Sequence, residues 1–537
     1  MRGSGGFRFH CGRIFGIICR RVDEKLTRAK SGIPRNQNKT TTTGPNTNIR
    51  WAIFIGIALL ALAVRLPQLG ERPMHTDESI NAYITGELLA GENFHYDPRD
   101  RHGPALFIVA EPLAKLLGAK NFSELTETQL RLSTVLTGTA TVLLLGAGVE
   151  MLGFIPCLVA ALLFAFAPLP VYYSRYFIHE TLFVAATLGL ILSGWRAQKN
   201  NSLWLTALAG GCAALMLACK ETAVIHFFAL AAAVAVGWRF QAAGKIPPAR
   251  IWLAGFITFL LALVLLFTWG GKSWSALADL FHAIPNFAAR AGGEGHEKPF
   301  WYYALLLAGG WSGAAVLAVA AIGFLRAVRH PASGARFVLV IYSLLVFVIY
   351  SIIPYKTPWL ALNFWLPLAI LAGIAIEWLW FSFPKFSARA VILLLIASIG
   401  FLTAHDTVKW VFIFPADEKN PYAYAHTGED LLRLPGRLEE LARQNQISNP
   451  RIAVVAIDAW PLPWYLRKFP QVGFWQPDQE TGPADFFITT TDVFGKLAER
   501  LKDFRPEFFG ERPNVLIILW TPNADDKKKQ NKEATKP

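Results

Sequence analysis

The sequence predicts an all-α polytopic membrane protein with about eleven transmembrane helices, followed by a small C-terminal α/β domain. Of the 537 residues, 53% are hydrophobic and only 17% are charged, whereas soluble domains have about 25% charged residues. Apolar runs of about 20 residues, long enough to cross a bilayer as helices, recur through the middle of the chain. Short strand-like runs appear only near the end. This pattern excludes an ordinary soluble enzyme and a disordered protein, and it argues against a membrane barrel of short alternating strands.

Residues 1–50 predict a disordered, basic cytoplasmic tail. Their only apolar stretch, residues 14–19, is too short for a signal peptide, and residues 36–48 are rich in Thr and Asn. The net charge of +14 would suggest nucleic acid in a soluble chain. Here the basic residues fit cytoplasmic loops better, so we expect no nucleic-acid partner.

The transmembrane domain is predicted over residues 51–404. Residues 104–118 form a short apolar run that contains Glu111, Pro112 and Lys115. Because a charge at mid-membrane costs about 2.5–3.5 kcal/mol, this run is predicted to lie along the outer surface. The predicted spans are residues 51–69, 130–149, 154–171, 178–195, 203–219, 222–238, 251–270, 301–325, 337–353, 358–380 and 390–403.

Loop charges predict the sidedness of these spans. With the N-terminal tail inside, most Lys and Arg of the later loops also fall inside, as the positive-inside rule requires. Residues 70–129 and 271–300 then form outer loops. We expect a bacterial or archaeal inner-membrane protein whose N-terminus is cytoplasmic and whose C-terminal domain is extracytoplasmic.

The C-terminal domain is predicted over residues 405–524, with a charged, solvated tail at 525–537. Residues 451–457, 485–489 and 514–520 have the β-branched, apolar character of strands. Residues 429–444 have helical spacing. We expect a small α/β domain, and a parallel sheet is one possibility.

The first candidate site follows span one, at residues 75–79. Asp77 and Glu78 are adjacent carboxylates beside an apolar surface. Partial desolvation and mutual repulsion both raise a carboxyl pKa and can poise one of the pair as a general base. The alternative is a solvated loop that carries two acids.

The second candidate site, residues 95–104, concentrates Arg and His around His102 and ends in Gly-Pro, which favours a turn. It is expected to hold an acceptor or an anionic headgroup; the alternative is contact with lipid phosphates. In the outer loop 271–299, a Gly-rich stretch predicts either a flexible cover over the substrate or a simple loop. The aromatic segment 460–467 predicts sugar binding or, slightly preferred, a hydrophobic dock onto the transmembrane core.

The third candidate site gathers charged residues at the outer ends of several spans. They are Arg175, Glu180, Lys220, Glu221, Tyr355 and Lys356. Cations are under-used on the outer face, so Arg175, Lys220 and Lys356 are expected where a site grips a phosphate. The alternative is snorkelling to outer headgroups.

Together these features resemble the GT-C superfamily, membrane glycosyltransferases that use polyprenyl-phosphate sugars. The likeness is carried by the Asp-Glu pair, the His-Gly-Pro surface helix, a Ser-Arg-x-x-x-x-Glu-like segment and the outer Lys-Glu. It is to the protein O-mannosyltransferase and lipid A aminoarabinose transferase branch, which is glycosyltransferase family 39-like. Residues 74–78, 217–221 and 460–467 look more narrowly like the prokaryotic "flippase activity-associated" family.

The resemblance implies a shared helical module with two juxtamembrane helices in the first outer loop. It also implies an inverting transfer from a polyprenyl-phosphate sugar to a protein, lipid or glycan acceptor within a lipid membrane. Asp77 would deprotonate the acceptor, and Arg175, Lys220 or Lys356 would stabilise the leaving phosphate. Glu78 would orient the acceptor, act as the base, or join a metal site.

Some members of the superfamily use a divalent metal ion, for which Asp77, Glu78 and His102 are the candidate ligands, and others do not. The alternative function is a non-enzymatic component of lipid-linked sugar translocation. If the enzyme hypothesis holds, Asp77, Arg175 and Lys220 should converge on one outer cavity roofed by residues 271–299.

Overall fold

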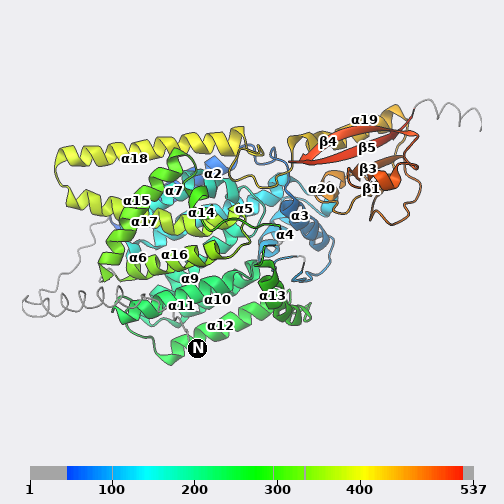
Figure 1. Cartoon of the computed structure of the whole chain (residues 1–537). Coiled ribbons are helices and arrows are strands. Elements are labelled where there is room, and N and C mark those ends of the chain that lie inside the picture. Colours follow the sequence, from blue (N-terminus) through cyan, green and yellow to red (C-terminus); the bar gives the residue numbers. More distant parts are fainter. Residues whose placement is uncertain (1–44, 100, 294, 332–333, 524–537) are drawn as a thin grey trace, which may run out of the picture. The chain divides into compact units, whose positions relative to one another are not determined.

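The computed structural model describes residues 45–99, 101–293, 295–331 and 334–523 (Figure 1). Most of the predicted N-terminal tail and the whole predicted C-terminal tail, residues 525–537, lie outside these ranges. The first described helix begins at Thr47, inside the predicted tail, because Asn46 accepts a hydrogen bond from the Ile49 amide and caps the helix.

Helices make up the protein from this cap to the C-terminal domain, and each predicted span overlaps at least one of them. The long helices are α2 (Thr47–Arg65), α5 (Glu127–Ala147), α7 (Phe154–Phe166), α9 (Glu180–Asn200), α10 (Leu203–Cys219), α11 (Ala223–Arg239), α12 (Ala249–Phe267), α15 (Gly310–Arg329), α16 (Ala335–Ile352), α17 (Leu362–Ser382) and α18 (Phe386–Thr407). Short helices between them are α6 (Val149–Leu152), α8 (Pro168–Ser174), α14 (Tyr302–Leu307) and the 3-10 turn η3 (Pro358–Ala361).

Length and composition identify seven membrane-span candidates among the described residues, or eight if α7 and α8 are one bent span. α10 and α11 are apolar but shorter. The protein is therefore a polytopic helical membrane protein. The predicted third span is broken: α7 and α8 meet at an angle of 59° beside Pro168, because proline cannot continue the hydrogen-bond ladder of a helix.

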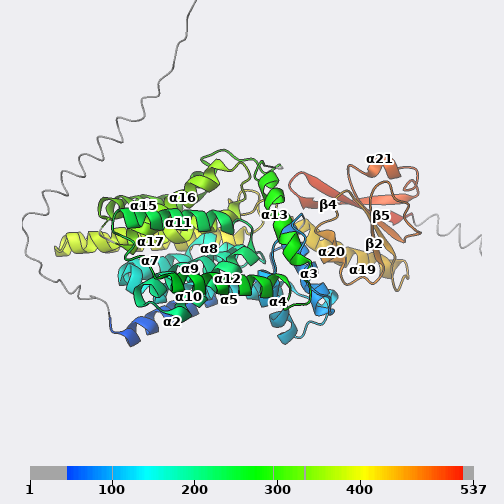
Figure 2. The same cartoon turned by 90° about the horizontal axis from the view of Figure 1, so that it is seen from below.

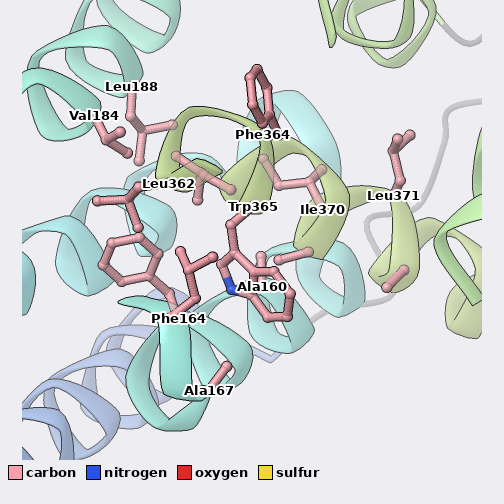
Figure 3. Close-up of a cluster of buried hydrophobic side chains, with 14 of the residues drawn as sticks. Ala160, Phe164, Ala167, Val184, Leu188, Leu362, Phe364, Trp365, Ile370 and Leu371 are labelled. Carbon is pink, nitrogen blue, oxygen red and sulfur yellow. The ribbon is translucent and has the colours of Figure 1, made fainter. Parts of the chain in front are cut away.

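The centre of the bundle is α17, whose apolar window is 94% buried, whereas the windows of α12 and α18 are only 11% buried. Figure 3 shows side chains of α17, including Trp365 and Ile370, against Phe164 of α7 and Leu188 of α9. A Cβ on Gly323 of α15 would lie 1.9 Å from the carbonyl oxygen of Leu371, so these two helices touch backbone to backbone. α12 and α18 thus face lipid around a tightly packed centre.

The segment predicted as the first outer loop contains two helices, as the resemblance implied. They are α3 (Thr76–Leu89) and α4 (Ala105–Leu116), followed by the 3-10 turn η1 (Phe122–Glu124). The second outer loop is more ordered than predicted, because it contains the amphipathic helix α13 (Ala276–Arg290). In both views α13 lies at the same end of the bundle as α3 and α4 (Figures 1 and 2).

The last transmembrane helix runs further than predicted. α18 ends at Thr407 and continues as a π-helix, η4 (Val408–Ile413). Residues 414–428 then lead to the C-terminal domain, which starts with the 3-10 turn η5 (Glu429–Arg433) and α19 (Leu434–Gln444). The segment 414–428 is called the linker below.

The C-terminal domain contains one five-stranded sheet in the order β2-β1-β3-β5-β4 (Figure 1). Its elements are β1 (Ile452–Val455), α20 (Leu462–Leu466), β2 (Val472–Trp475), β3 (Phe486–Thr490), α21 (Phe494–Leu497), β4 (Phe504–Arg512) and β5 (Val515–Pro522). β1 pairs in parallel with β2 and β3, but β5 is antiparallel to β3 and β4. The sheet is therefore mixed: β2, β1 and β3 form the parallel part that was considered from the sequence, and β5 and β4 add an antiparallel hairpin.

Candidate functional site

Glu78 of α3 is fully buried and has four hydrogen-bond donors around its carboxylate. Arg131 of α5 donates to both oxygens at 2.8 Å, and the amides of Phe177 and His75 donate at 2.8 and 3.2 Å. Burial raises the pKa of Glu78, but the lowering effects of Arg131, Arg72 and these hydrogen bonds outweigh it and bring the pKa to about 2. Glu78 is thus an internal counter-ion, with no lone pair left open toward a substrate.

Arg175 is likewise occupied inside the protein. Its guanidinium donates to the carbonyl oxygens of Arg65 at 2.8 Å and Gln68 at 3.1 Å, and also to Pro67. α2 ends at Arg65, so these carbonyls have no helical partner, and Arg175 satisfies them. The structure therefore does not bring the Arg175 side chain to a common outer cavity with Asp77 and Lys220.

Asp77, next to Glu78, has the opposite environment. Its side chain is 44% exposed, and its backbone amide donates to Nδ1 of His75, the N-cap of α3, at 3.0 Å. The other nitrogen of that ring, Nε2–H, donates to the carbonyl of Tyr424 in the linker at 3.1 Å. Burial lowers the pKa of His75 more than Asp77 and Glu78 raise it, so the ring is neutral and holds this tautomer.

Lys220, at the outer end of α10, pairs with Glu180, which begins α9. Burial lowers the pKa of Lys220, but the raising effects of Glu180, and then of Tyr355 and Asp77, outweigh it. The pKa is therefore raised overall. The ammonium is therefore charged and lies within electrostatic reach of Asp77. Burial raises the pKa of Tyr355, on which the charges of Lys220, Asp77 and Glu180 also act, so the four residues lie within electrostatic reach of one another.

His102 and Glu221 form the neighbouring polar pair. His102 Nδ1–H donates to Glu221 at 3.0 Å, and the Tyr96 hydroxyl donates to the same carboxylate at 2.8 Å. Burial raises the pKa of Glu221, but the lowering effects of His102 and these hydrogen bonds outweigh it and bring the pKa to about 2. The His102 side chain remains 33% exposed, so it offers its other nitrogen to a ligand.

Gly103 explains why this turn reaches the end of α10. A Cβ at Gly103 would lie 2.4 Å from the carbonyl oxygen of Ala218, and His179 Nε2–H donates to the Gly103 carbonyl at 3.2 Å. Only a glycine allows this backbone approach. The turn after residue 102 is thereby fixed against both the Lys220–Glu180 pair and Glu221.

The second predicted outer loop contacts Tyr355 and Lys356, the remaining two residues of the third candidate site. Glu297 and Tyr355 form an isolated bridge, and Lys356 Nζ donates to the carbonyls of Lys298, at 3.0 Å, and Ile353. Lys356 is 1% exposed, and burial lowers its pKa. Lys356 therefore fastens the loop and is largely committed to carbonyl oxygens.

The structure thus brings together Asp77, Glu180, Lys220, Tyr355 and, beside them, the His102–Glu221 pair. Glu78, Arg175 and Lys356 lie behind this group as supports. Sequence reasoning missed the linker, where Tyr424 accepts from His75 and shares a 2.8 Å hydrogen bond with His296 of the outer loop. Nothing local in the linker sequence signals this contact.

Within the described part of the chain, no three His, Cys, Asp or Glu side chains are gathered closely enough to hold a metal ion. Asp77, Glu78 and His102 are therefore not one ligand group. Glu78 is held by Arg131 and His102 by Glu221 instead.

The fold is that of solved GT-C glycosyltransferases. ArnT from Cupriavidus metallidurans, solved with undecaprenyl phosphate bound, has a TM-score of 0.61 at 15% identity and covers 88% of this chain and 98% of its own. The oligosaccharyltransferase AglB from Archaeoglobus fulgidus, in complex with an inhibitory peptide and a dolichol-phosphate, has a TM-score of 0.52 at 13% identity and covers 89% and 76%. No protein-family model and no curated protein matches the sequence.

Proposed function

We propose that the protein is an integral-membrane, inverting glycosyltransferase that moves a sugar from a polyprenyl-phosphate donor to a protein, lipid or glycan acceptor. The observation that carries the proposal is a partly exposed carboxylate, Asp77, within electrostatic reach of a buried but charged Lys220 in a GT-C fold. Such a pair suits a proton acceptor beside a departing phosphate.

In the proposed reaction, Asp77 accepts the proton of the acceptor's hydroxyl or amine group. The freed oxygen or nitrogen attacks the anomeric carbon of the sugar and forms the new glycosidic bond. The bond between that carbon and the phosphate oxygen breaks, and its electron pair leaves with the polyprenyl phosphate. Because attack and departure occur on opposite sides, the anomeric configuration inverts.

Lys220 supports the leaving phosphate in this proposal, because its ammonium has protons beyond the one directed at Glu180. His102 donates through Nδ1 to Glu221, so the other nitrogen of its partly exposed ring is an acceptor, which suits a hydroxyl of the substrate and not the phosphate. Fixed donors aimed at the developing charge stabilise a transition state without reorganising during the reaction. Arg175 and Lys356 hold the backbone around this pair instead of touching the phosphate.

The site is placed on the outer face of a prokaryotic inner membrane, with the N-terminus inside. This sidedness follows from the distribution of Lys and Arg among the loops. Modification of a cysteine introduced at position 92, with a membrane-impermeant reagent on intact cells, checks it directly. Labelling only after the membrane is permeabilised would contradict it.

The test of function uses the purified full chain in lipid nanodiscs with a panel of polyprenyl-phosphate sugars, and measures released polyprenyl phosphate. Asp77→Asn should lower the rate by about 10²–10⁴-fold, the usual contribution of a general base. Glu92→Gln, an exposed acid in the same outer loop, is the matched control and should retain activity. Equal rates for Asp77→Asn and wild type would remove Asp77 as the base. Lipid-linked sugar transport without transfer would favour the flippase-associated alternative.

A further inference from the structure

A cavity of about 450 Å³ lies between the first outer loop and α13. The first loop contributes His95, Asp97 and Arg99, and α13 contributes Asp279, His282 and Asn286. None of these six residues is used in the proposed reaction. A cavity of this volume is in the range of small-molecule sites.

The walls of the cavity are held in place by apolar packing and by a polar contact. Phe94 packs against Trp269 at 5.8 Å and Tyr96 against Phe267 at 5.1 Å, between ring centroids, so the loop is anchored on the end of α12. The Arg290 guanidinium, at the end of α13, donates to the Arg99 carbonyl. The cavity is therefore built by two loops that are fastened to each other.

The chemistry of the lining favours a neutral, hydroxyl-rich ligand. Carboxylates accept hydrogen bonds, a guanidinium donates them, and imidazole and amide groups do both, so together they can match the paired donor and acceptor character of sugar hydroxyls. Two carboxylates against one arginine disfavour an anion such as a phosphate. Prolines 98 and 285 add small apolar faces between the polar groups.

The cavity also adjoins the proposed reaction site. Its wall residue Tyr96 donates to Glu221 at 2.8 Å, and Glu221 follows Lys220 directly in the chain. The charge of Arg290 acts on both Tyr96 and Tyr355. One wall of the cavity is therefore connected by direct contacts to the residues of the proposed reaction site.

We propose that this cavity is an acceptor subsite that binds an uncharged oligosaccharide, so that the acceptor is a glycan of at least two sugar units. The inference rests on the proposed glycosyltransferase function. The distal unit of the glycan hydrogen-bonds to Asp279 and Asn286, and its next unit presents a hydroxyl to Asp77.

The test measures binding of uncharged mannose, glucose and galactose disaccharides to the purified full chain in nanodiscs, by saturation-transfer NMR. Wild-type protein should bind at least one of them. Asn286→Ala and Asp279→Asn should each weaken that binding by up to about tenfold, as expected for one lost hydrogen bond. Lys272→Ala, an exposed change in the same outer loop, should leave it unchanged.

A second readout separates this inference from the proposed function. Asp77→Asn should keep disaccharide binding and lose release of polyprenyl phosphate, whereas Lys272→Ala should change neither. Absence of binding by every disaccharide would overturn the subsite, as would binding that the cavity variants do not weaken, even if transfer itself is demonstrated. Binding of a lysine-containing tripeptide, weakened by the cavity variants, together with no binding of any disaccharide, would assign the cavity to a peptide instead.

Discussion

Replacing each of the two adjacent acids, Asp77 and Glu78, by its amide should separate stability from activity. Glu78 is fully buried and accepts hydrogen bonds from Arg131, Phe177 and His75. Asp77 is 44% exposed. Glu78→Gln should therefore destabilise the protein, whereas Asp77→Asn should leave its stability nearly unchanged and abolish transfer.

The magnitude follows from the contacts of Glu78. A fall in its pKa from 4.5 to about 2 corresponds to about 3 kcal/mol of stabilisation by the folded surroundings. Removing one partner of a buried ion pair typically costs about 3–5 kcal/mol, because the remaining charge has no counter-ion. Both figures agree on a loss of about 3 kcal/mol, since Gln still accepts one hydrogen bond.

The sign of the pH dependence is also fixed. Because the folded pKa is lowered, the contribution of Glu78 is fully present above about pH 4.5 and is lost as the pH falls toward about 2. The difference in thermal midpoint between wild type and Glu78→Gln should therefore be constant at pH 6–8 and shrink below pH 4.5.

The assay is thermal unfolding of wild type, Asp77→Asn and Glu78→Gln, each purified in nanodiscs. Release of polyprenyl phosphate is then measured at a temperature at which all three proteins are folded. Folded Glu78→Gln should keep substantial activity. An unchanged midpoint together with lost transfer in Glu78→Gln would refute the reasoning. It would make Glu78, and not Asp77, the acid that meets the acceptor.

Two further predictions concern backbone fit and the C-terminal domain. Gly103→Ala places a Cβ 2.4 Å from the Ala218 carbonyl oxygen and should cost about 1–3 kcal/mol and reduce transfer, whereas Gly56→Ala, with open space around it, should do neither; thermal midpoints and transfer rates check this. Burial raises the pKa of Glu511 to about 7, so its contribution to stability is lost as the pH rises from about 4.5 to 7. Glu511→Gln should raise the thermal midpoint at pH 8 and change it little at pH 5; an equal shift at both would contradict the assigned cause.

The helices were predictable because their signal is local. A run of about 20 apolar residues specifies a membrane helix whatever lies around it. Residues 104–118 were not predicted to span the membrane, because the run is short and burying its two charges in lipid is costly. α13 was not predicted, because it is an amphipathic helix of an outer loop that is interrupted by Pro285 and flanked by glycines. Such a helix is stabilised by packing its apolar side, including Leu277 and Leu280, against neighbours far away in the sequence.

The hairpin of β4 and β5 was missed for a similar reason. β4 carries charged residues and Pro506, so its composition does not indicate a strand. β4 forms because it pairs, along nearly its full length, with β5, whose apolar run was recognised in the sequence. Pairing, rather than propensity, makes β4 a strand.

Within the candidate site, sequence identified the polar positions but not their burial. Asp77 and Glu78 are neighbours in the chain, and no local feature tells which one faces water. The difference arises from Arg131 and the amide of Phe177, which lie 53 and 99 positions away from Glu78. The role of His75 depends in the same way on Tyr424, 349 positions away.

Arg175 shows why an unusual outer cation does not by itself mark a phosphate site. α2 stops at Arg65, and the chain then turns through residues 66–75 at the membrane surface, where its carbonyl oxygens have no helical partner. A buried carbonyl without a donor is costly, and a guanidinium, with five N–H donors, can satisfy several at once. Arg175 and Arg131 do this for carbonyls between positions 65 and 73. The two arginines are therefore explained by the backbone of the turn that presents Asp77. Of the three cations that the sequence pointed to, Arg175, Lys220 and Lys356, the proposed reaction keeps Lys220 for the substrate phosphate.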